Sequence, residues 1–216
     1  MQIDLSVLEI ACSRLCHDLI SPVGAVSNGL ELMIDDPDPE LLVEASALAQ
    51  RSAKRAALLL HVYRSAYGNA GNQPSFGPAE AVRMVEALLE GEKASLEATI
   101  PARAELWPAG FGKLVLNTLM AAMEWLPRGG KISLKVTDGS GGEPGFDLSV
   151  DGPQLTYSDE TARLLQAESI EGPLTAHNVQ AYLAGIMAKR HGLSLRPAVI
   201  SAGRLNVKTM AENRAA

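Results

Sequence analysis

The sequence predicts an α+β protein in which a long antiparallel helical hairpin is followed by an α/β sandwich domain. Two long segments carry apolar residues at helical spacing and are joined by a short stretch rich in aspartate and proline, which predicts the hairpin. A linker containing glycine and asparagine comes next, and beyond it short alternating segments mix with helical ones. We place the hairpin at 1–67, the linker at 68–78 and the sandwich domain at 79–216.

The first helix is expected over residues 4–34. Residues 35–39 (DDPDP) end it, because proline cannot continue a helix and aspartate favours turns and helix N-caps. Apolar or small residues recur every three or four positions along the helix, and we expect this stripe to pack against other helices. The stripe consists of Leu5, Leu8, Cys12, Leu15, Leu19, Pro22, Val26, Gly29 or Leu30, and Met33.

The second helix is expected over residues 40–66, with its own stripe at the same spacing. Two long helices joined by a tight loop form an antiparallel hairpin. A lone hairpin buries its apolar stripe poorly, so a homodimer forming a four-helix bundle is the expected assembly. The second stripe consists of Leu41, Ala45, Leu48, Ser52, Ala56, Leu59 and Tyr63.

The remaining elements alternate between helix and strand. Ser158 is a suitable N-cap for one helix, and Gly192 closes another. Helices and antiparallel strands in this order predict a sandwich with the helices on one face of a sheet. The expected helices span 78–92, 112–126, 158–167 and 175–191, and the expected strands span 97–100, 104–107, 131–137, 146–150, 193–195 and 204–209.

Composition excludes several classes of function. The net charge of −6, with no cluster of lysine and arginine to override it, argues against nucleic-acid binding. No apolar run is long enough to span a bilayer and no signal peptide is present, so a cytoplasmic protein is expected. The two cysteines, Cys12 and Cys16, are expected as reduced, semi-buried thiols. A metal site combining them with His17 is disfavoured, because His17 faces elsewhere and no second ligand cluster exists.

His17 is the leading candidate for chemistry. It lies two residues from both Leu15 and Leu19, which places it roughly 160–200° around the helix from the apolar stripe and therefore in solvent. Arg14 and Ser21 lie at i−3 and i+4, on the same predicted face. An exposed imidazole can accept and donate a phosphoryl group, since histidine side chains titrate near neutral pH and offer a neutral nitrogen as nucleophile.

The order of these segments resembles that of a sensor histidine kinase core. The sequence HDLISPVGAV at 17–26, followed by NGLEL at 28–32, resembles most closely the ChpT-type histidine phosphotransferases of bacterial cell-cycle relays. The resemblance covers essentially the whole chain. It implies a dimerisation and phosphotransfer hairpin followed by a degenerate ATP-binding domain.

Three departures from the kinase pattern argue against ATP use. The resemblance places an asparagine box at 116–123, where Asn117 remains but Ala121 stands where the metal-holding asparagine is expected, and alanine offers a cation no oxygen. The adenine-binding box is reduced to Asp151-Gly152-Pro153, with the wrong glycine spacing. Residues 175–180, where phosphate-cradling glycines are expected, contain none. We therefore expect no cofactor, with Mg²⁺ supplied on a partner receiver domain.

The expected reaction is a relay through His17 between receiver-domain aspartates. Asp18 is expected to bond the second ring nitrogen or act as a base, and Arg14 to offset phosphoryl charge. The resemblance implies the receiver of a CckA-type hybrid histidine kinase and the CtrA-type and CpdR-type response regulators as partners. Expected docking residues are Arg14, Ile20, Ser21 and Gly24.

Two alternatives remain open from the sequence. One is a divergent histidine kinase that still binds nucleotide. The other is a non-catalytic dimer that inhibits kinases by mimicry. Labelling by ATP alone separates the first from a relay protein, and failure to accept phosphate from any receiver separates the second.

Overall fold

The computed structural model describes residues 5–35, 38–102, 107–138, 144–167 and 173–212. The chain divides into two compact units, Met1–Arg64 and Ser65–Ala216, which are considered separately below. The residues expected as a linker, 68–78, lie within the second unit and contain the short 3₁₀ helix η1 (Asn69–Asn72).

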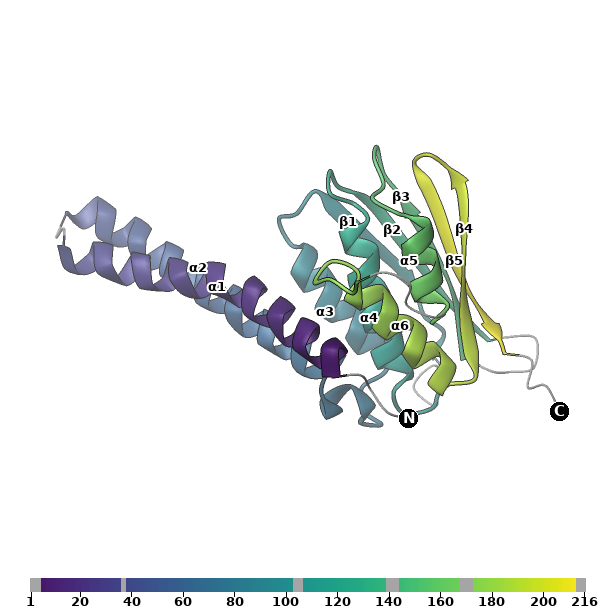
Figure 1. The fold of residues 1–216 in the computed structure, drawn as a ribbon. Coiled ribbons are helices and arrows are strands. Elements are labelled where there is room, and N and C mark those ends of the chain that lie inside the picture. The colour runs from purple at the N-terminus through teal and green to yellow at the C-terminus, as the bar shows by residue number, and fades with distance from the viewer. Residues whose placement is uncertain (1–4, 36–37, 103–106, 139–143, 168–172, 213–216) are drawn as a thin grey trace. The chain divides into compact units, whose positions relative to one another are not determined.

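The first unit is the predicted helical hairpin (Figure 1). Helix α1 spans Leu5–Asp35 and helix α2 begins at Pro39 and ends at Ala66, close to the expected bounds. The Asp38 carboxylate accepts a 2.8 Å hydrogen bond from the backbone amide of Glu40, and Pro39 stands at the first helical position. This cap explains why the chain turns at the DDPDP stretch and immediately resumes helix.

The two helices approach closely at Gly29. A Cβ atom at this position would lie 3.0 Å from the carbonyl oxygen of Ala45 and 3.1 Å from the Cβ of Ala49. Only small residues permit such a short separation between helix backbones. Gly29 and Ala45 are accordingly buried.

The predicted stripe of α1 does not pack against α2 in its N-terminal part. Leu5 and Leu8 are exposed, Leu8 by 56 %. Cys12 and Cys16 are also exposed, which corrects the expectation of semi-buried thiols. The physical reason is that this part of α1 meets α2 through hydrogen-bonding residues such as Arg14 and Asp18, so Leu5 and Leu8 lie on a different side of the helix.

The second unit contains one five-stranded sheet in the order β1-β2-β3-β5-β4. Strand β1 (Ala94–Thr99) pairs parallel with β2 (Gly130–Asp138), and all other neighbours are antiparallel. The remaining strands are β3 (Pro144–Asp151), β4 (Leu193–Ser201) and β5 (Arg204–Ala211). Alternate side chains of β2, β3 and β5 are buried, which is the period of a strand with one covered face.

Helices cover one face of this sheet, as the sequence predicts (Figure 1). They are α3 (Pro78–Leu89), α4 (Phe111–Glu124), α5 (Asp159–Leu165) and α6 (Val179–Arg190). Ser158 caps α5, since its hydroxyl accepts a 3.2 Å hydrogen bond from the amide of Thr161. Helix α4 lies at the centre of the helical layer and is almost wholly buried.

Two of the expected elements differ from the structure by four or more residues at one end. Helix α6 begins at Val179 rather than at 175, because Thr175 and Asn178 close a turn before it. Strand β4 continues six residues beyond the expected end at 195. Most of the strand expected over 104–107 lies outside the described residues, and Trp107 is in a bend.

No described helix is long and apolar enough to cross a membrane.

Candidate functional site

His17 projects from the middle of α1 into solvent, as the helical phase predicts. Its side chain is 81 % exposed, and its Nδ1 lies 3.1 Å from Oδ1 of Asp18. An ionised carboxylate can only accept hydrogen bonds, so this contact requires the proton on Nδ1. The Nε2 lone pair is then left free and directed away from Asp18, which is the arrangement that a nucleophilic imidazole needs.

Tyr63, on α2, orients Asp18 from the other side. Its phenol donates a hydrogen bond to Oδ2 of Asp18, while Nε of Arg14 donates to the phenol oxygen over 3.4 Å. Burial, together with the hydrogen bond to Asp18, raises the pKa of Tyr63 to about 12. The phenol therefore remains a donor throughout the neutral range, and both carboxylate oxygens of Asp18 have a defined partner.

Arg14 has a different environment from the one expected. Only 12 % of its side chain is exposed, and its Nε lies 4.0 Å from Oδ2 of Asp18. The Arg14 side chain is directed toward Tyr63 on α2 rather than along the face of His17. Residues three apart in a helix lie about 60° apart around its axis, and this offset turns Arg14 toward α2. Its contacts make it a support for the pair of Tyr63 and Asp18.

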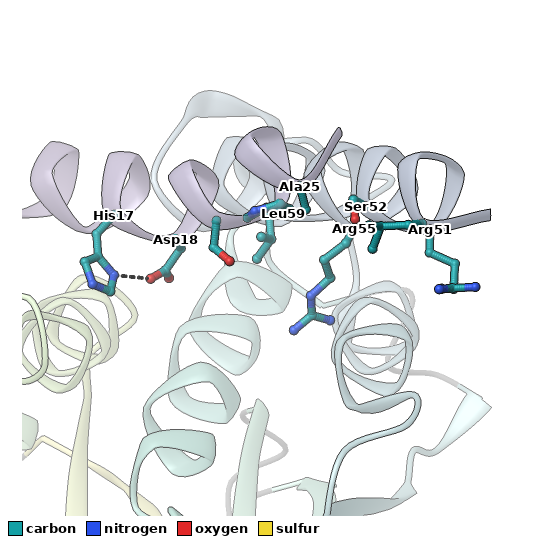
Figure 2. A pocket seen from close by; sticks show the side chains of 10 residues that line it. His17, Asp18, Ala25, Arg51, Ser52, Arg55 and Leu59 are labelled. Atoms are coloured by element: carbon teal, nitrogen blue, oxygen red, sulfur yellow. Dashed lines mark hydrogen bonds and ion pairs between the residues drawn. The ribbon is translucent and has the colours of Figure 1, made fainter. Parts of the chain in front are cut away.

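A shallow groove of about 560 Å³ begins at His17 and runs along the hairpin between α1 and α2 (Figure 2). One wall carries His17 and Ser21 from α1, and the other carries Arg51 and Arg55 from α2. In Figure 2 the side chains of His17, Arg51 and Arg55 project to the same side of the helices. The remaining lining residues are Asp18, Pro22, Ala25, Leu48, Ser52 and Leu59.

Only some of the expected docking residues lie in the groove beside His17. Ser21 lines the groove beside His17, whereas Ile20 and Gly24 are exposed on α1 outside it. A Cβ atom at Gly24 would meet nothing within 4 Å, so this part of α1 has a smooth, open surface. The structure thus brings Ser21 together with His17 and Asp18 and leaves Ile20 and Gly24 beside them.

In the second unit, the polar groups that match the kinase pattern form hydrogen bonds within the protein. The buried amide of Asn117 donates to the carbonyl oxygens of Ala66 (3.1 Å) and Lys113 (2.8 Å). Its carbonyl accepts a 2.6 Å bond from Nε2 of Gln180, whose Oε1 accepts a 2.8 Å bond from the phenol of Tyr67. The donors and acceptor of Asn117 are therefore satisfied by the protein itself.

The other two segments that resemble nucleotide-binding boxes of kinases also make contacts within the protein. Asp151 ends β3 and forms an ion pair with Arg204, its register partner on β5. The turn before α6 is closed by Asn178, whose side-chain oxygen accepts a 2.7 Å bond from the amide of Thr175. Ala121 is buried within α4 and offers only a methyl group.

Comparison with known proteins identifies the family. A profile of the histidine phosphotransferase C-terminal domain matches residues 78–203. The chain is 33 % identical over 199 residues to the protein phosphotransferase ChpT of Brucella abortus (strain 2308), covering 90 % of this chain and 92 % of that protein.

The chain belongs to the histidine phosphotransferase family.

A solved structure agrees with this assignment. A bacterial phosphotransferase determined at 1.7 Å superposes with a TM-score of 0.77 at 30 % identity, covering 97 % of this chain and 98 % of that chain. The resemblance stated from the residues is thus confirmed, and so is the α+β fold.

The structure places around His17 three residues that the sequence did not single out. Tyr63 is predicted only as an apolar position of the α2 stripe, and the sequence patterns point to no role for Arg51 and Arg55. A signal for the arginines was present, because residues 45–66 carry four lysines and arginines and no carboxylate. No comparable signal existed for Tyr63, whose role depends on its alignment with Asp18 across the hairpin.

Proposed function

We propose that this histidine phosphotransferase relays a phosphoryl group through His17 between receiver-domain aspartates, without using ATP. The observation that carries the proposal is the exposed His17 imidazole, whose Nδ1 is held by Asp18 so that Nε2 is the available nucleophile. Such transfer depends on positioning and charge neutralisation more than on further covalent chemistry.

In the proposed step, Nε2 of His17 attacks the phosphorus of an aspartyl phosphate on the partner. The new P–N bond forms as the P–O bond to the aspartyl carboxylate breaks, and that carboxylate leaves with its electron pair. Positive charge develops on the imidazole ring, and the Asp18 carboxylate beside Nδ1 stabilises it. Mg²⁺ is expected on the receiver domain, and the reverse reaction passes the phosphoryl group on to a second receiver.

The second unit supports the part of the proposal that excludes ATP. Asn117 is bonded to Ala66, Lys113 and Gln180, and Asp151 is paired with Arg204. A nucleotide would have to replace these contacts while Ala121 gave no oxygen to its metal. The free energy gained by binding a nucleotide is therefore expected to be small.

The proposed assembly is a cytoplasmic homodimer. In α1 an apolar stripe that does not face α2 includes the exposed residues Leu5, Leu8, Val23, Leu30 and Ile34. A contiguous apolar face on a helix is typical of an interaction surface, and the same face on a second copy would bury it in a four-helix bundle.

The proposed partners follow the family resemblance. The receiver of a CckA-type hybrid histidine kinase is the proposed phosphodonor, and CtrA-type and CpdR-type response regulators are the proposed acceptors. Residues Ser21, Ile20 and Gly24, beside His17, remain proposed contacts of the receiver.

The test uses two phosphate sources. The full chain is incubated with radiolabelled ATP alone and then with the phosphorylated receiver of a CckA-type kinase. We expect label only from the receiver, and we expect it to be abolished by His17→Ala. His61→Ala is the matched control, because His61 is also an exposed histidine of the hairpin.

Two results would contradict the proposal. Labelling by ATP alone would indicate a divergent kinase. Failure to accept phosphate from the receiver, with the protein folded and His17 intact, would favour the kinase-mimic alternative.

A further inference from the structure

One segment of α2 carries only positive charges. The whole chain has a net charge of −6, yet residues 45–66 of α2 carry Arg51, Lys54, Arg55 and Arg64 and no aspartate or glutamate. Ordinary helix surfaces carry both signs interspersed, and a field of one sign is costly unless it attracts a ligand or partner. The basic segment is therefore unusual in this acidic protein.

Two of these cations lie in the groove that begins at His17. Arg51 and Arg55 are one helical turn apart and share a wall of the groove, while Lys54 is exposed outside it. Within the part of the chain that the structure describes, no carboxylate forms an ion pair with Arg51. Leu48 and Leu59 add apolar surface to the same groove, which gives it the mixed character of a protein interface.

The opposite wall of the groove carries one carboxylate, Asp18, which is engaged by Tyr63 and by His17. Ser21 and Pro22 complete that wall without charge. The groove therefore presents His17 at one end and two arginines along the opposite wall.

We propose that Arg51 and Arg55 form a basic docking strip that binds carboxylates on the receiver surface next to its phosphorylated aspartate. The inference rests on the proposed function and adds to it the residues that select the partner. A receiver must hold Mg²⁺ and a phosphoryl group through carboxylates, so the surface that it brings to His17 is rich in negative charge. A strip of arginines alongside the nucleophile attracts that surface and fixes its register by charge-assisted hydrogen bonds.

The strip acts on encounter rather than on the transfer step. Arg55 is eight residues from Tyr63, which is roughly 12 Å along α2, so its guanidinium would contact the partner at a distance from the transferring group. Charges at such positions change association rates and their dependence on salt. Losing them is therefore expected to raise the receiver concentration needed for half-maximal transfer.

The experiment measures transfer from the phosphorylated receiver to His17 over a range of receiver concentrations and ionic strengths. The double variant Arg51→Glu/Arg55→Glu is expected to raise the half-saturating receiver concentration about tenfold at low salt, with a smaller effect on the saturating rate. Its transfer is also expected to depend less on salt than that of the wild type. Circular dichroism verifies that the hairpin remains folded.

Two further variants decide whether the positive charge in the groove is responsible for receiver binding. Lys54→Glu reverses one charge, half the change made by the double variant, on the same helix but outside the groove, and it is expected to leave transfer close to the wild type. Arg51→Lys/Arg55→Lys keeps the charge and is expected to retain most of the transfer.

The docking strip would be overturned if Lys54→Glu impaired transfer as strongly as the groove variant, or if the groove variant matched the wild type. In both cases wild-type transfer would still support the proposed function. Absence of transfer to the wild type would overturn the function and the strip together.

Discussion

The hydrogen bonds around Asp18 determine how His17 presents its ring. The carboxylate accepts from His17 on one oxygen and from Tyr63 on the other, and Arg14 supports the phenol. Groups that orient a reactive histidine through its second nitrogen fix its tautomer and its basicity. In the proposed transfer, Tyr63 is expected to be a positioning residue, which would act on the phosphoryl group only through Asp18 and His17.

Removing the phenol tests this arrangement. Tyr63→Phe is expected to slow phosphoryl transfer roughly tenfold, because Asp18 loses the donor that holds it toward Nδ1. Tyr182→Phe, in the second unit, is the control and is expected to have no effect. Equal rates for Tyr63→Phe and the wild type would show that Asp18 needs no support.

Tyr63→Phe is also expected to change how the stability of the protein depends on pH, which a simple loss of packing would not do. The pKa of Tyr63 is raised from 10.0 to about 12, so folding favours the protonated phenol. This stabilisation is complete below pH 10 and is lost as the pH rises toward 12. Thermal unfolding of the wild type is expected to show this alkaline loss, and the Tyr63→Phe curve is expected to show less of it.

The sequence predicted the residue at the centre of the site better than its surroundings. The exposure of His17 followed from helical phase alone. The orientation of Arg14 did not follow from helical phase. Arg14 lies three residues before His17, near the boundary between α1 and α2, so its side chain could point either toward α2 or toward solvent. Its direction is decided by Tyr63, which is distant in sequence, and helical periodicity contains no information about which residue faces which across a hairpin.

At the scale of the element, the contact between α1 and α2 depends on small residues. Gly29 meets Ala45 and Ala49 at distances that leave no room for a side chain. Gly24, little more than one turn earlier in the same helix, has open space around its Cα. The two glycines therefore form a matched pair for testing the packing.

Leucine at each position is expected to have opposite effects. Gly24→Leu is expected to stabilise the hairpin by up to about 1 kcal/mol, because leucine has the higher helix propensity. Gly29→Leu is expected to destabilise it by about 1–3 kcal/mol through overpacking. Denaturant unfolding measures both, and a stabilising Gly29→Leu would contradict the close approach of the helices.

Helix and strand positions were largely predictable because long amphipathic periods and Gly and Pro boundaries are local signals. The face that α1 turns toward α2 was not. Only part of its apolar stripe, such as Gly29, makes this contact, and polar residues outside the stripe, such as Arg14 and Asp18, share it. The start of α6 was also missed, since the bonds between Thr175 and Asn178 form a turn that periodicity does not distinguish from a first helical turn.

At the scale of the whole molecule, the apolar stripe of α1 leads to a prediction about assembly. Leu8 is 56 % exposed and Val23 55 %, and both lie on the side of α1 that does not face α2. In the proposed homodimer, Leu8→Glu/Val23→Glu places two charges in an apolar interface and is expected to give monomers. Size-exclusion chromatography with light scattering measures the mass.

Ile200→Glu is the control for that experiment. Ile200 is 57 % exposed on β4, in the second unit, so the substitution changes the surface equally without touching the stripe. We expect it to leave the dimer intact. A wild-type monomer, or a dimer unaffected by the α1 variant, would contradict the proposed assembly.

The chain of hydrogen bonds from Tyr67 through Gln180 to Asn117 has a consequence for the cell as well as for the fold. The second unit pairs the buried amides of Asn117 and Gln180 with its own groups, so no bound ligand is needed to satisfy them. If the protein works as the proposed relay without ATP, the folding of this unit is expected not to depend on the ratio of ATP to ADP. Such a relay is expected to remain active when ATP is scarce, so that its output reports the phosphorylation state of its partners.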